Sequence, residues 1–129
     1  MSKLDKESVI GISALLVHAA NIDEIYSSHE KNLVKDFIKS YLKNDDANEI
    51  LQKAEDVESN SNQLLNYTNI IKQNSMEIKK DIIEHLWKVI ISDNSIDQYE
   101  ANLMRRICGL IYFPDKECAE IKLNLLNSR

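Results

Sequence analysis

Residues 86–111 read LWKVIISDNSIDQYEANLMRRICGLI, in which an acidic stretch separates two runs rich in apolar residues. In both runs apolar residues recur three and four positions apart, which is the period of an amphipathic helix. The acidic stretch, residues 93–100, contains three carboxylates and lacks this period. This part of the sequence therefore predicts two helices, over residues 76–92 and 98–111, joined by an acidic connection.

A related pattern occurs seventy residues earlier, in NIDEIYSSHEKNLVKDFI at residues 21–38. Apolar runs precede both segments, and conservative pairs fill many of the positions between identical residues. The identical pairs are Asp23 and Asp93, Glu30 and Glu100, Asn32 and Asn102, and Leu33 and Leu103. We interpret the chain as an internal duplication of a unit in which an acidic turn joins two helices.

Over the whole chain, apolar spacing predicts seven helices and no strand, and two glycines and one proline in 129 residues agree with this. The expected ranges are residues 5–22, 28–43, 46–54, 57–73, 76–92, 98–111 and 114–126. Ser75 is a suitable N-cap for the fifth helix and Pro114 a suitable first residue for the seventh. The first range is apolar nearly all round, which indicates a central position. We therefore expect an all-α bundle, with residues 1–129 forming one domain.

The chain carries a net charge of −5 and has a pI near 5.2. Nucleic-acid binding needs a basic face that replaces the counterions of phosphates, so we exclude nucleic acid as a general partner. Membrane insertion is not expected, because the apolar run at residues 8–22 is too short to span a bilayer. Cys108 and Cys118 lack the CxxC spacing of a zinc site. We expect both thiols to be reduced, with Cys108 in the core and Cys118 nearby, in a cytoplasmic protein.

The acidic connections have a structural interpretation as helix caps. Ser27 precedes Glu30 by three residues, and Asp97 precedes Glu100 by the same distance. This is the spacing of a capping box, in which each side chain accepts from a backbone N–H of the other residue. Such a cap stabilises a helix by about 1 kcal/mol without any ligand.

A cation site is the second interpretation of the same residues. Asp23 and Asp93 follow the ends of helices, where the helix dipole disfavours a carboxylate, so capping does not explain them. The spacing of Asp93, Ser95 and Asp97 is that of the first EF-hand ligands, but positions 98 and 104 lack the required Gly and Glu. A partner-binding acidic patch is a third interpretation. The candidate ligands of a divalent cation such as Ca²⁺ or Mg²⁺ are Asp93, Asp97 and Glu100, with Asp23 and Glu30 as weaker counterparts.

The two segments resemble the repeats of the TerB family, the tellurite-resistance protein B-like domain, whose signature is Ala-Asp-Gly-x-(Ile/Leu)-(Asp/Ser)-x-x-Glu. The ending IYFPDKECAEIK is also similar to the last loop and helix of that family. Glu24 and Asn94 stand where the signature has glycine. The resemblance implies a seven-helix fold, an association with resistance to tellurite and other stresses, and metal binding through the signature acids. These acids correspond to Asp93, Asp97 and Glu100 in the second repeat, and to Asp23 and Glu30, with Ser27, in the first.

The sequence contains no nucleophile–base motif and no Gly-rich phosphate loop, so we expect no enzyme, no catalytic residue and no organic cofactor. His18, His29 and His85 are expected in the core or on a helix surface, not as ligands. We expect a small stress-response module that binds a cation or a partner protein through its acidic turns, and homodimer formation is left open. Two alternatives remain: a helical scaffold whose acids only cap helices, and a metal-dependent hydrolase built on the second set of acids.

Overall fold

The computed structural model describes residues 4–21, 28–43, 46–60, 64–91 and 98–127 of the chain. The all-α prediction and the number of helices are confirmed for these residues, which contain no strand. The internal duplication stays a prediction. The helices are α1 (Lys6–Ala20), α2 (Ser28–Tyr41), α3 (Ala47–Asn60), α4 (Leu64–Lys72), α5 (Met76–Ile91), α6 (Gln98–Leu110) and α7 (Asp115–Asn127).

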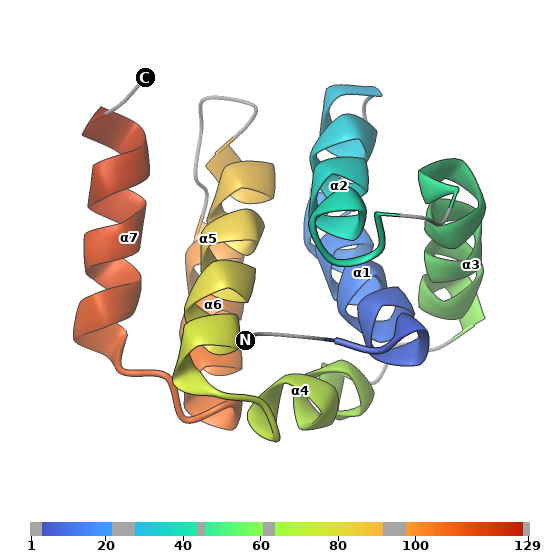
Figure 1. Cartoon of the computed structure of the whole chain (residues 1–129). Helices are drawn as coiled ribbons and strands as arrows, with labels where there is room; N and C mark the ends of the chain where they lie inside the picture. Colours follow the sequence, from blue (N-terminus) through green and yellow to red (C-terminus); the bar gives the residue numbers. More distant parts are fainter. Residues whose placement is uncertain (1–3, 22–27, 44–45, 61–63, 92–97, 128–129) are drawn as a thin grey trace.

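The helices are arranged side by side, with α3 and α7 at opposite edges and α4 running across the lower side (Figure 1). Two pairs lie between the edges, α1 with α2 and α5 with α6. The packing of α1 and α2 against α5 joins the two halves of the bundle. Within the described residues, no helix combines the length and the apolar character needed to cross a bilayer.

The central position predicted for the first helix is confirmed. α1 packs against α2, α3, α4 and α5, and it is buried on nearly all sides. Asp5 is its N-cap, because the backbone N–H of Ser8 donates to Oδ1 of Asp5 at 2.7 Å. Interactions with the side chain of Ser8 and with its backbone N–H lower the pKa of the Asp5 carboxyl from its usual value. The residues that α1 contributes to the core include Val9, Ile12, Leu15, Leu16 and Val17.

α5 buries its apolar stripe as the period predicts, with Ile82, Ile83 and Leu86 fully inaccessible to solvent. Its N-cap is Ser75, whose Oγ accepts a hydrogen bond from the backbone N–H of Ile78 at 3.3 Å. This prediction is confirmed. α2 faces α5 and α1 through a narrower stripe of Val34, Phe37 and Ile38, and its neighbours Leu33, Tyr41 and Leu42 are only partly buried.

The predicted boundary between the third and fourth helices is wrong. Residues 57–60 belong to the end of α3, not to α4, which begins at Leu64. Val57 is 37% exposed and starts no new stripe. A tertiary contact accounts for the longer α3: Nδ2 of Asn21 donates to Oε1 of Glu58 at 3.3 Å, and Nδ1 of His18 lies 3.4 Å from Oε2 of the same carboxylate. The end of α3 is therefore tied to the end of α1.

The connection between α6 and α7 is a tight C-terminal cap. The backbone N–H of Phe113 donates to the carbonyl of Cys108 at 2.8 Å, and Tyr112 adopts a positive φ of 60°. These are the features of a Schellman motif, which reverses the chain just after a helix. Pro114 precedes α7 and is not its first residue as predicted, because its carbonyl accepts from the backbone N–H of Cys118 at 3.1 Å, in the manner of an N-cap.

Candidate functional site

The five acids predicted as ligands lie mostly outside the described residues, which do not include Asp23, Asp93 or Asp97. Glu100 is the third residue of α6, but the structure describes only its backbone and not its side chain. Glu30 is the third residue of α2, where the helix dipole favours a carboxylate. It is only 6% exposed and interacts with a partner within the fold, as a buried carboxylate requires.

The described helix ends show where the two acidic stretches are attached. The first stretch connects the end of α1 to the start of α2, and the second connects the end of α5 to the start of α6. All four of these ends lie toward the upper side of the molecule in Figure 1, away from α4. Both acidic stretches are therefore anchored on one side of the bundle, a relation that the sequence could not settle.

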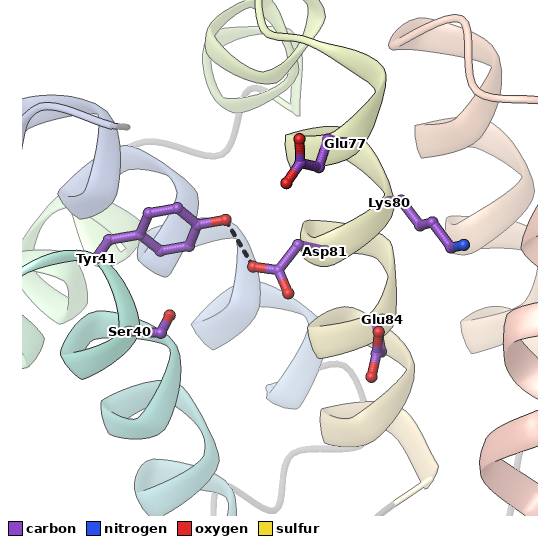
Figure 2. Close-up of a pocket in the computed structure, with 6 residues that line it drawn as sticks. All are labelled: Ser40, Tyr41, Glu77, Lys80, Asp81 and Glu84. Carbon is purple, nitrogen blue, oxygen red and sulfur yellow. Dashed lines mark hydrogen bonds between the residues drawn. The ribbon is translucent and has the colours of Figure 1, made fainter. Parts of the chain in front are cut away.

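A second group of acids lies within the described residues, in a hollow of about 380 Å³ between α2 and α5. The three carboxylates of the hollow follow one another along α5, on successive turns, and Lys80 points away from Tyr41 (Figure 2). The residues that line the hollow are Ser40 and Tyr41 from α2, and Glu77, Lys80, Asp81 and Glu84 from α5.

A hydrogen bond between Tyr41 and Asp81 spans this hollow. The Tyr41 hydroxyl donates to Oδ2 of Asp81 at 2.6 Å, a short distance typical of an O–H donor and an ionised acceptor. Partial burial and this hydrogen bond raise the pKa of Tyr41 well above its usual value. One turn further along α5, Nδ1 of His85 donates to the backbone carbonyl of Asp81 at 2.9 Å and lies 3.6 Å from Oδ1. Asp81 thus has one partner on α2 and another on α5.

The family profile described as tellurite resistance protein TerB matches residues 10–123 of the chain. The match spans all seven helices apart from the first residues of α1 and the last residues of α7. The chain belongs to the TerB family. Comparisons with curated proteins and with solved structures gave no match.

The hollow of this TerB-family chain contains no nucleophile–base set. The Ser40 hydroxyl donates to the backbone carbonyl of Phe37 at 2.7 Å, so its proton is not directed at a general base. Glu84 lies 3.7 Å from the ammonium of Lys88, and Asp81 is occupied by Tyr41. Among the residues that the structure describes, no group of three or more His, Cys, Asp or Glu side chains could hold a metal ion. The hollow is therefore an acidic surface region in which Asp81 and Glu84 already interact with side chains of the same chain.

Sequence reasoning missed this hollow, although one signal for it was present. Glu77, Asp81 and Glu84 are four and three residues apart, which places them on one face of a helix. The partners Tyr41 and Ser40 were not predictable, because they approach α5 only through the packing of α2. His18 and His85 have partners in the fold, and His29 is exposed. That none of the three is a ligand stays a prediction.

Proposed function

We propose that this TerB-family chain is a non-catalytic binding module that recognises positive charge through its two acidic stretches, residues 23–30 and 93–100. The charge is carried by a divalent cation such as Ca²⁺ or Mg²⁺, or by a basic segment of a partner protein. The observation that carries the proposal is the location of the four flanking helix ends on one side of the bundle. Flanking helix ends on one side are what a binding face shared by the two stretches requires.

Three further features support this function. Hard divalent cations prefer carboxylate oxygens, and the second stretch supplies Asp93, Asp97 and Glu100. The net charge of −5 favours cationic ligands over anionic ones. The hollow between α2 and α5 adds three acids against one lysine to the negative charge of the molecule. We include in the proposal a role in tellurite resistance, which the family description names, and in the wider stress response that the resemblance implies.

The proposal is tested by calorimetric titration of the chelator-treated chain with Ca²⁺, Mg²⁺, Mn²⁺ and Zn²⁺, and with a lysine-rich peptide. The Asp93→Asn, Glu100→Gln variant removes two charges from the second stretch. A matched control, Glu49→Gln, Glu120→Gln, removes two exposed charges from α3 and α7. We expect saturable heat with a cation or with the peptide, lost in the first variant and kept in the control.

The opposite result favours the scaffold alternative. If neither the cations nor the peptide bind, and Asp93→Asn, Glu100→Gln only lowers the melting temperature, the acids act as caps and the binding proposal is wrong. A metal-stimulated hydrolysis of ester or phosphate substrates that is lost in the same variant would instead favour the metal-dependent hydrolase. The control variant identifies losses that come only from reduced negative charge.

A further inference from the structure

The two cysteines of the chain meet where α5, α6 and α7 pack together. Cys108 lies near the end of α6 and is fully buried, and Cys118 lies in the first turn of α7 and is 6% exposed. The thiols of Cys108 and Cys118 interact with each other. The indole Nε1–H of Trp87, from α5, donates to the sulfur of Cys118 at 3.3 Å. Cys118 therefore has two partners inside the fold.

The Schellman motif between α6 and α7 creates this pairing. Its backbone hydrogen bond from Phe113 to the carbonyl of Cys108 folds the chain back within ten residues. As a result the first turn of α7 lies over the last turn of α6. Both cysteines are free thiols in this arrangement.

Cys118 also borders a hollow of about 350 Å³ that opens to solvent on the outer side of α5, α6 and α7. The hollow is lined by two cationic side chains, Arg105 and Lys122, against one acid, Asp115. The ammonium of Lys122 lies 5.5 Å from the centre of the Trp87 ring. Cys118 is among the residues that line this hollow, whereas Cys108 is not and is fully buried.

The surroundings of the two thiols favour different protonation states. Hydrogen bonds from Cys108 and from Trp87 lower the pKa of Cys118, while burial opposes this change. The pKa of Cys108 is raised, because its proton is donated to Cys118 and because the thiol is buried. The thiolate is the nucleophilic form of cysteine. These surroundings, together with the hydrogen bond from Trp87 and the place of Cys118 in the lining of the hollow, favour Cys118 as the reactive thiol.

We propose that Cys118 is a modification site for small hydroperoxides and that Cys108 is its resolving thiol. The Cys118 thiolate attacks one peroxide oxygen and the O–O bond breaks, which gives a sulfenic acid and releases an alkoxide or hydroxide that takes up a proton. The sulfur of Cys108 then attacks the sulfur of Cys118, and the hydroxyl group leaves as water with the Cys108 proton. In total, two thiols are oxidised to one disulfide, and one peroxide is reduced to an alcohol, or to water if hydrogen peroxide reacts, with a second molecule of water formed.

The geometry favours this oxidation over metal binding at the same place. Two thiols without a third neighbouring ligand do not form a closed site, and no group of three ligating side chains exists among the described residues. A disulfide forms when the two interacting sulfurs approach to about 2.05 Å, and it needs no third ligand. The inference is independent of the acidic stretches and of the proposed binding function.

The first experiment treats the reduced full chain with a small excess of hydrogen peroxide and follows intact mass and peptide maps. The wild-type chain is expected to lose two hydrogens and to gain no oxygen. Cys118→Ser is expected to remain unmodified at the same dose, and Cys108→Ala to gain one oxygen at Cys118 that dimedone traps. Oxidation of Cys108 first, or disulfides only between separate chains, would overturn the proposal.

A second experiment keeps both thiols, because replacement of the fully buried Cys108 can disturb folding. It measures the rate of iodoacetamide labelling of Cys118 as a function of pH in wild type and in Trp87→Phe, which loses the N–H donor but keeps an aromatic ring. The wild-type midpoint is expected below that of a cysteine in the urea-unfolded chain, and the variant midpoint above that of wild type. Lys122→Met is expected to raise the midpoint, whereas Lys116→Met, on the exposed side of α7, is not. Equal labelling of Cys118 in the folded and unfolded chains refutes the proposal.

Discussion

At the residue scale, the hydrogen bond between Tyr41 and Asp81 is the best-defined polar link between α2 and α5. Tyr41→Phe removes the donor and leaves the ring in place. We expect the free energy of unfolding to fall by about 1–2 kcal/mol, because the lost bond is made to a charged acceptor in a partly buried site. Urea denaturation measures this value. Tyr112→Phe is the control, because Tyr112 is 67% exposed, and a loss as large in the control as in Tyr41→Phe would contradict the assignment.

The raised pKa of Tyr41 also predicts a pH dependence of stability. The folded chain holds the Tyr41 proton more tightly than the unfolded chain, so the contribution of this group is fully present below about pH 10, the usual tyrosine value. As pH rises above this value the unfolded chain loses its proton first, and the contribution is lost. The difference in unfolding free energy between wild type and Tyr41→Phe should therefore shrink between pH 9 and about pH 11. A difference that stays constant over this range would show that the hydrogen bond does not shift the pKa.

At the scale of a single element, the two glycines occupy opposite environments. A Cβ at Gly109, on the exposed side of α6, meets no atom within 4 Å, whereas a Cβ at Gly11, on α1, lies 2.5 Å from Cδ1 of Ile70. Gly109→Ala should therefore stabilise the chain by about 0.5–1 kcal/mol, since alanine has the higher helix propensity. Gly11→Ala should gain less or lose stability, because Ile70 must move. Equal gains in thermal denaturation would show that Ile70 moves at no cost.

In the Schellman motif after α6, we expect glycine at position 112 to give a more stable chain than alanine, which is the reverse of their usual order in a helix. Tyr112 has a φ of 60°, a conformation that costs L-residues energy but not glycine. Tyr112→Gly and Tyr112→Ala both lose the ring, and with it the contact with the ammonium of Lys72 at 4.9 Å. The glycine variant should be the more stable of the two by about 1 kcal/mol. An alanine variant that is equally stable in urea would indicate that this turn changes conformation.

At the scale of the whole molecule, the sequence predicted the elements better than the contacts between them. The period of apolar residues gave seven helices because each one buries a stripe, as in the run from Ile78 to Ile90 of α5. The end of α3 was missed because it depends on Glu58 reaching His18 and Asn21 across the fold. Sites that form through contacts between distant helices were missed for the same reason. The acidic hollow and the thiol pair arise from packing of separate helices, and the predicted acidic ligands other than Glu30 lie in parts of the chain that the structure does not describe in full.

The arrangement of the helices also predicts how the molecule opens. α1 is surrounded by four helices, whereas α7 lies at an edge, packs on α5 and α6, and exposes Leu123 at 55%. Local opening follows burial and contact density. Backbone amides of α1 should therefore exchange hydrogen most slowly, and those of the second half of α7 among the fastest of the seven helices, as measured by exchange with mass spectrometry.

Exchange at two protein concentrations turns this prediction into a test of self-association. If α7 exchanges quickly at both concentrations, its apolar side chain Leu123 is exposed in the monomer as the structure has it. Protection of α7 that increases with concentration would instead show that another copy of the chain covers this edge, because self-association depends on concentration. Strong protection of α7 at both concentrations would contradict the predicted order of opening. Oxidation of the thiol pair should slow exchange in the last turn of α6 and the first turn of α7, since the disulfide joins Cys108 to Cys118.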